Sequence, residues 1–153
     1  TYLILRARNV EKIWWYNFRA FEFNNTDFEW HYGIMYHTLG PKPAYRAYRT
    51  LTELCPEGAT LAAPIPPDGE RWMAAWRRPD GKKVHAVWST GEPADRSFRF
   101  RGSLERVHDL FGAAVAVKPQ GDVLQLPLSG SVIYVVGPEE LSHAAPAATA
   151  KAN

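Results

Sequence analysis

A loop over residues 19–33 carries the side chains with the most evident chemistry. Three carboxylates and a histidine lie close together in it: Glu22, Asp27, Glu29 and His31. A carboxylate pair beside a histidine can act as general acid and general base, or can hydrolyse an ester. Acidic side chains in loops are more often simply solvated, so solvation is the competing interpretation of this group.

Two adjacent tryptophans, Trp14 and Trp15, precede this loop within a bulky run at residues 10–18. Aromatic rings can fill a core or stack on sugar rings, and 13% of the chain is aromatic. Because side chains alternate along a strand, the two indoles must point to opposite sides. The sequence does not fix which of them faces a binding site, and core packing of both is the competing interpretation.

Other common catalytic patterns are missing from the sequence. Ser89, Ser129 and Ser131 stand in no Gly-x-Ser-x-Gly elbow, and no glycine-rich phosphate loop is present. The five histidines show no paired spacing typical of a metal site. Cys55 is the only cysteine, which excludes an internal disulfide and indicates a buried structural thiol. We therefore expect neither a metal nor a cofactor.

Composition predicts a folded protein without a strongly charged partner. Of the 153 residues, 46% are hydrophobic and 22% are charged, which is typical of a chain with a buried core. The net charge of +2 is too small to indicate nucleic acid. No stretch approaches the ~20 apolar residues of a membrane span, and the first residues lack the features of a secretion signal. Since the chain begins inside an apparent helix, we expect it to be truncated.

The first 58 residues predict one strand–helix unit. Residues 1–9 are typical of a helix end, and residues 10–18 of a strand that is covered on both faces, as in a parallel sheet. After the long loop, residues 44–54 place apolar side chains at helical spacing. A parallel strand needs neighbours on both sides, and the sequence supplies one such strand. Its neighbours must come from a missing N-terminal portion or from another copy in a homo-oligomer.

The remainder predicts a second unit made of short strands. Residues 62–137 alternate between strand and turn patterns and favour an antiparallel β-sandwich. Trp72, Trp76 and Trp88 take alternating inward positions and are expected in its core. Residues 138–153 are small and polar and predict a flexible tail. The expected fold is mainly β, an antiparallel sandwich preceded by one βα unit.

The order of these segments resembles the C-terminal part of retaining glycoside hydrolases of the large (β/α)₈ clan, in particular the β-xylosidase and cellulase-like families. The matching motifs are residues 14–17, Tyr32-Gly33-Ile34, Lys42-Pro43-Ala44-Tyr45, Val87-Trp88-Ser89, Asp109-Leu110-Phe111-Gly112 and Ile133-Tyr134-Val135-Val136. The resemblance covers residues 1–137. It implies that residues 1–58 are the end of one helix, the last strand and the last helix of a barrel, followed by the family's β-sandwich.

The resemblance also limits what the chain can do. Such enzymes use two glutamic acids about 5 Å apart, one as acid/base and one as nucleophile. In that family they end the fourth and seventh strands, which lie before the first residue here, so no catalytic residue is carried over. The end of the eighth strand faces the active site of a barrel. There Trp15 resembles the aromatic platform for the sugar, and Tyr16 and Asn17 can hydrogen-bond its hydroxyls. An extracellular or periplasmic location is implied by the family alone.

Three functions follow as alternatives. The first is a C-terminal fragment of a glycoside hydrolase acting on O-glycosidic bonds, inactive or only carbohydrate-binding by itself. The second is a small stand-alone hydrolase, a glycosidase or an esterase, with a site at an oligomer interface built from the loop acids and His31. The third is a free-standing carbohydrate-binding sandwich, which the inward positions of its tryptophans disfavour.

Overall fold

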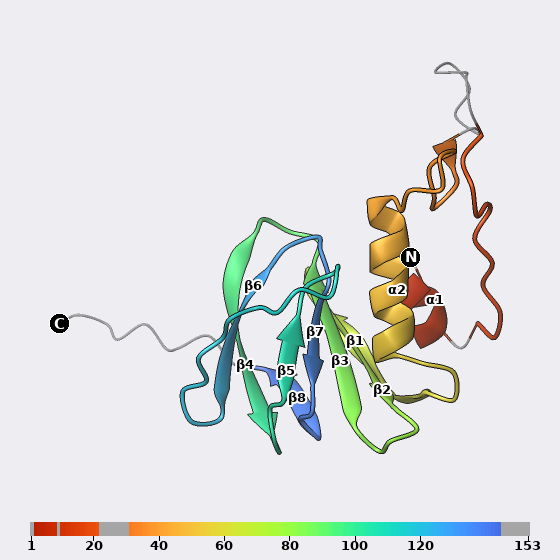
Figure 1. The fold of residues 1–153 in the computed structure, drawn as a ribbon. Coiled ribbons are helices and arrows are strands. Elements are labelled where there is room, and N and C mark those ends of the chain that lie inside the picture. The colour runs from red at the N-terminus through yellow and green to blue at the C-terminus, as the bar shows by residue number, and fades with distance from the viewer. Residues whose placement is uncertain (1, 9, 22–30, 145–153) are drawn as a thin grey trace.

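The computed structural model describes residues 2–8, 10–21 and 31–144, except for the side chains of residues 63–66. The described chain is mainly β, with two antiparallel sheets packed face to face and two helices against the outer face of the larger sheet (Figure 1). None of the described helices is long and apolar enough to cross a bilayer. The predicted class, a mainly β protein with an antiparallel sandwich, is confirmed.

Both described helices precede the strands in the chain. The helices are α1 (Tyr2–Ala7) and α2 (Pro43–Leu54). The strands are β1 (Thr60–Asp68), β2 (Arg71–Arg77), β3 (Lys83–Ser89), β4 (Ala94–Arg101), β5 (Arg106–His108), β6 (Val123–Leu128), β7 (Ile133–Val136) and β8 (Glu140–His143). The larger sheet has the order β1-β2-β3-β7-β5 and the smaller sheet β6-β4-β8, with every neighbouring pair antiparallel.

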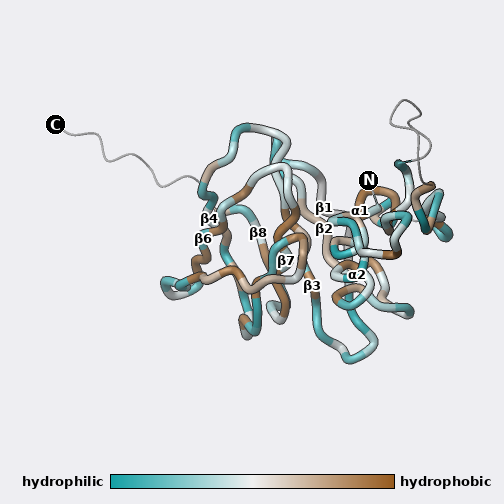
Figure 2. The backbone as a smooth tube through the Cα atoms, turned by 45° about the horizontal axis from the view of Figure 1, so that its top comes forward, coloured by the Kyte–Doolittle hydropathy of each residue, from teal (hydrophilic) through white to brown (hydrophobic). Residues whose placement is uncertain are grey.

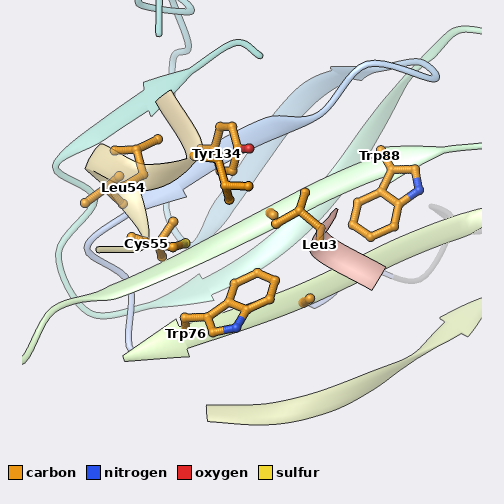
Figure 3. Close-up of a cluster of buried hydrophobic side chains, with 11 residues drawn as sticks. Leu3, Leu54, Cys55, Trp76, Trp88 and Tyr134 are labelled. Atoms are coloured by element: carbon orange, nitrogen blue, oxygen red, sulfur yellow. The ribbon is translucent and has the colours of Figure 1, made fainter. Parts of the chain in front are cut away.

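The larger sheet is buried on both faces, because successive side chains of a strand point to opposite sides. Toward the smaller sheet, Val87 of β3 joins a core that includes Phe98 and Leu126. The opposite face of the sheet packs against the helices and forms a second core (Figure 3). Its members include Leu3, Leu54 and Cys55 from the helical side, and Trp76, Trp88 and Tyr134 from the sheet.

Two arginines attach the end of α2 to the rest of the molecule. Arg78 follows β2, in a turn whose hydrophilic character is visible in Figure 2. Its Nη1 donates to the main-chain carbonyls of Glu53 and Leu54, at 3.2 Å each. From α1, Nη1 of Arg6 donates to the carbonyl of Cys55 at 3.0 Å. Carbonyls at a helix C-terminus have no partner within the helix, so these bonds stabilise α2 in its place.

The strand predicted at residues 10–18 is not formed. The segment runs extended between α1 and the following loop, and no strand is assigned to it. A parallel bridge joins Arg19 to Met35 directly after it. The bulky, β-favouring side chains are present, but a strand also needs a neighbouring backbone for its N–H and C=O groups. The described chain places no strand beside residues 13–16.

The sandwich extends further along the chain than the sequence predicts. Glu140–His143 forms β8, inside the predicted tail, and pairs with β4. Leu141 is 6% exposed and belongs to the core between the sheets. One buried side chain and a ladder of cross-strand hydrogen bonds are enough to order this short edge strand. Residues 145–153 of the predicted tail lie outside the described residues.

Candidate functional site

Trp15 is held by two contacts on the helical side of the molecule. Its indole stacks on the ring of Tyr2 from α1, with 5.8 Å between ring centroids and an interplanar angle of 21°. Its Nε1 donates to the main-chain carbonyl of Tyr32 at 2.8 Å. Tyr2 in turn meets Tyr48 of α2 edge-on, at 5.5 Å between centroids. Trp15 is still 48% exposed, so part of the indole stays open to solvent.

Tyr16 and Asn17, the other two predicted sugar contacts, have different surroundings. Tyr16 is 66% exposed, and its ring is available to a ligand or to another chain. Asn17 is partly buried, and its side-chain Oδ1 is buried without a hydrogen-bond partner among the described residues. Its main-chain carbonyl accepts a hydrogen bond from the N–H of Ile34 at 3.2 Å. Of the three residues, Tyr16 presents the most free surface.

Main-chain hydrogen bonds fix this segment against the chain that leads into α2. The N–H of Met35 donates to the carbonyl of Phe18, and the N–H of Ala20 donates to the carbonyl of Met35, both at 2.9 Å. Gly33 makes the close approach possible, since a Cβ built there would lie 2.0 Å from the nitrogen of Ala20. A residue without a side chain is therefore required at this crossing.

An apolar hollow of about 240 Å³ opens beside Trp15, between the helices and the sandwich. It is lined by Tyr2, Leu3, Trp15, Ile34, Ala44, Ala47, Tyr48, Leu51, Leu110, Val132 and Tyr134. None of its described lining residues is charged, so these residues supply neither an acid/base pair nor a metal ligand set. A second hollow, of about 460 Å³ at residues 17–21, has no carboxylate among its described lining residues.

The alternative catalytic group is only partly visible. Glu22, Asp27 and Glu29 lie outside the described residues. His31 is exposed, and its main-chain carbonyl accepts a hydrogen bond from Nζ of Lys42 at 2.9 Å. Among the residues that the structure describes, no group of three or more His, Cys, Asp or Glu side chains is placed to hold a metal ion.

Exposed hydrophobic side chains are concentrated around this site. Apart from Phe111, every large hydrophobic residue that is exposed in the described chain belongs to residues 10–48. These residues are Val10, Trp14, Trp15, Tyr16, Phe18, Phe21, Tyr32, Tyr36, Leu39 and Tyr48. We call this set the aromatic surface. Large exposed apolar patches typically mark a surface that contacts a partner or a ligand.

Sequence reasoning missed the part played by Tyr2 and recognised Tyr48 only as a member of the buried helix face. Burial is the main cause that raises the pKa of Tyr2 above its usual range, and Tyr48 adds to the effect. Tyr48 precedes Leu51 by one helical turn, a spacing that places both on the same side of α2. No sequence signal connects Tyr2 with Trp15, because their contact depends on how the extended segment folds back along α1.

A sandwich with two helices packed on the outer face of its larger sheet is thus the class of structure to which the chain belongs. No protein-family model and no curated protein matches the sequence. Among solved structures, the chain is similar to a family 39 glycoside hydrolase from the gut symbiont Bacteroides cellulosilyticus WH2. The TM-score is 0.72 at 24% sequence identity, and the match covers 90% of this chain and 28% of that one.

A second solved structure with a similar fold is the catalytic domain of GH30 xylanase C from Talaromyces cellulolyticus. Here the TM-score is 0.57 at 13% identity, over 69% of this chain and 27% of that chain. The chain therefore spans little more than a quarter of the length of either structure. At these identities the likeness establishes the fold: the chain is related in structure to part of glycoside hydrolases.

Proposed function

We propose that the chain is the C-terminal part of a glycoside hydrolase acting on O-glycosidic bonds. The observation that carries this proposal is the likeness in fold to a family 39 glycoside hydrolase over 90% of the chain, at a TM-score of 0.72. A match over 90% of the chain cannot be confined to the sandwich strands, which begin at Thr60. In this proposal the sandwich supports the catalytic barrel and the segment at residues 15–17 borders the sugar site.

The proposed part does not perform the chemistry by itself. Retaining hydrolysis requires two carboxyl groups about 5 Å apart on either side of the scissile bond. Neither of the hollows beside residues 15–17 is lined by a carboxylate among the described residues. We expect the isolated chain to bind carbohydrate weakly, and to hydrolyse neither glycosides nor esters.

The sugar contacts follow from what remains exposed at the end of the extended segment. One face of the Trp15 indole is occupied by Tyr2, so a sugar ring would use the open remainder. Tyr16 offers a phenol ring and a hydroxyl next to it. An indole packs well against the C–H face of a pyranose, and hydroxyls are recognised by hydrogen bonds from the polar groups around it.

The aromatic surface is proposed to pack against the remaining strands and helices of the barrel within a longer polypeptide, or against the same surface of a second copy of the chain, with the sugar-facing sides of Trp15 and Tyr16 at its border. With these side chains between about 40% and 80% exposed, at about 150–250 Å² for each full aromatic side chain, the surface offers roughly 1,000 Å². A stable interface needs about 800 Å² from each partner. Light scattering of the isolated chain tests whether a second copy is the occupant.

Carbohydrate binding is tested by titrating ¹⁵N-labelled protein with xylo- and cello-oligosaccharides. The proposal expects shifts at residues 15–17 that Trp15→Ala and Tyr16→Ala remove. Trp15→Phe is the matched variant that keeps a ring on Tyr2, and Phe111→Ala changes an exposed aromatic residue of the sandwich as a control. Shifts that survive both alanine changes would show that this segment is not the sugar site.

Activity assays separate this proposal from a stand-alone hydrolase. The observation that favours the alternative is the exposed His31 next to Tyr32, whose carbonyl holds the Trp15 indole. Purified protein should be assayed on aryl glycosides and aryl esters. Hydrolysis that is lost in Glu22→Ala, Asp27→Ala, Glu29→Ala or His31→Ala would establish the alternative and reject an inactive part.

A further inference from the structure

A histidine with buried ring nitrogens stands at each end of the edge strand β8, and of the two residues His85 is buried and His143 half-buried. His85 of β3 is 3% exposed, and its Nε2 donates to the main-chain carbonyl of Pro138 at 2.9 Å, just before β8 begins. His143 is the last residue of β8 and lies opposite Phe98 of β4, with 5.1 Å between the ring centroids. His85 therefore contacts the residue that leads into β8, and His143 is part of β8 itself.

Neither imidazole has a hydrogen-bond acceptor in the described chain that could receive a second N–H group. A carbonyl oxygen only accepts, so Nε2 of His85 carries its proton and Nδ1 is the bare nitrogen. That Nδ1 is buried and has no hydrogen-bond partner in the described chain, and the same holds for both ring nitrogens of His143. Protonation would add a charge and an N–H group where no acceptor stands, which is costly in a buried position.

The charged side chains around His85 do not offset the free-energy cost of protonating its imidazole. Lys83 lies on the same face of β3, and Glu139 follows Pro138 in the connection to β8. Glu139 already pairs with Lys83 at 3.1 Å and with Arg77 of β2 at 3.2 Å. Burial is the main cause that lowers the pKa of His85, and Lys83 lowers it further. The bond to Pro138 and the charge of Glu139 oppose this shift only in part.

The surroundings of His143 also lower the pKa of its imidazole. The charged groups that face it are Arg71 of β2 and Asp68 of β1, and these two form an ion pair with each other. Burial is the main cause that lowers the pKa of His143, and Arg71 adds to it, while Asp68 opposes it. Two neutral rings are thus favoured in the folded protein, one at each end of β8.

We propose that β8 is an acid-released edge strand: protonation of His85 and His143 detaches residues 138–144 from the smaller sheet and uncovers the edge of β4, while the other strands stay paired. The opening stays local because, in the described chain, β8 has four residues, pairs with β4 alone and contributes Leu141 to the buried core, to which the released segment adds the buried Pro138. Edge segments with few buried contacts open at a lower free energy than central strands. Strand β3, in contrast, is paired on both sides by β2 and β7.

The direction of the pH dependence follows from the lowered pKa values. Both rings are neutral in the closed strand and take up a proton when it opens. Closure is thus fully favoured above the ordinary histidine pKa of about 6.5 and is weakened as the pH falls below it. Each unit by which burial lowers one of these pKa values increases the opening equilibrium roughly tenfold at low pH.

Amide hydrogen exchange at pH 7 and pH 5, corrected for the intrinsic exchange rates, measures this opening strand by strand. The proposal expects the amides of residues 139–144 to lose about tenfold in protection at pH 5, while β2 and β3 keep theirs. His85→Gln retains an N–H for the Pro138 carbonyl, His143→Phe retains the ring on Phe98, and neither can be protonated. The double variant should lose the pH dependence of β8, and His108→Gln, in the other sheet, should keep it.

Three results would overturn the proposal. They are unchanged protection of β8 at pH 5, an equal loss of protection in all strands, and a pH dependence that persists in the double variant. If His85→Gln does not fold, His143→Phe alone decides the matter. It must reduce the loss of β8 protection severalfold compared with the wild type, and a loss equal to that of the wild type rejects the proposal.

Discussion

Arg78 reaches across from the β2–β3 turn to the last turn of α2, where its Nη1 lies 3.2 Å from the carbonyl oxygen of Leu54. The same nitrogen is 3.2 Å from the carbonyl oxygen of Glu53. A side chain of the sandwich thereby caps a helix that is packed on its outer face. The helices and the sandwich are consequently joined by specific hydrogen bonds as well as by a shared core.

Arg78→Ala should lower the free energy of unfolding by about 1–3 kcal/mol, because the part-buried carbonyl of Leu54 and the exposed carbonyl of Glu53 both lose a charged donor. Arg49→Ala is the matched control, since Arg49 forms an exposed ion pair with Glu53 within α2. Exposed pairs of this kind contribute about 0.3–0.5 kcal/mol. Urea unfolding of the two variants measures both changes in the free energy of unfolding. Equal changes would show that the contact of Arg78 with α2 stabilises the protein no more than an exposed ion pair does.

Two tryptophans should differ sharply in their effect on stability. Trp76 is 1% exposed in the core between the helices and the larger sheet, whereas Trp14 is 81% exposed. Trp76→Ala should cost about 3–5 kcal/mol, as large-to-small changes in a core do. Trp14→Ala should change the free energy of unfolding by less than about 0.5 kcal/mol. Denaturant unfolding curves measure both changes. A large loss of stability for Trp14→Ala in a monomer would contradict the exposed position of Trp14.

Gly33→Ala should release the extended segment from the chain before α2. A Cβ at this position would lie 2.0 Å from the nitrogen of Ala20, so the two backbones must separate. Gly40→Ala is the control, since the nearest atom to its Cβ would be 3.7 Å away. We expect the Trp15 indole N–H resonance to shift in the first variant and not in the second. An unshifted resonance in Gly33→Ala would mean that this crossing does not position Trp15.

Cys55 should resist thiol reagents in the folded state. Burial raises its pKa to about 11, although the guanidinium groups of Arg6 and Arg78 partly oppose the shift. The thiolate is the reactive form, so labelling at pH 8 should proceed only through opening of the structure. Because the folded state disfavours ionisation, this thiol makes the protein less stable as the pH rises above the ordinary thiol pKa. Rapid labelling at pH 8 without denaturant would contradict this environment.

The parts of the fold that the sequence predicted well are those that local pattern determines. Trp72, Trp76 and Trp88 alternate with their neighbours, and all three lie on the helix-facing side of the larger sheet. Helix α2 begins at Pro43, where a proline suits the first turn, and buries Leu51 and Leu54. In these cases the period of the apolar residues is enough to indicate both the element and its buried side.

The parts that sequence analysis missed depend on distant partners. β8 has one apolar anchor, and its pairing with β4 joins residues about 40 positions apart, as in the pair of Phe100 with Leu141. Residues 10–18 show the opposite case, since the β-favouring side chains there have no strand beside them in the described part of the chain. The orientation of Trp15 likewise follows from its contact with Tyr2, which no local pattern encodes.

Because both faces of the larger sheet are covered, removing the elements on either face would expose buried apolar side chains. A shortened protein that began after α2 would turn the wall formed by Trp76, Ala86 and Tyr134 toward water. Such a product should precipitate or bind chaperones even though every strand of the sandwich is still encoded. For domain grafting or fusion, the smallest portable unit therefore includes both helices together with the sandwich.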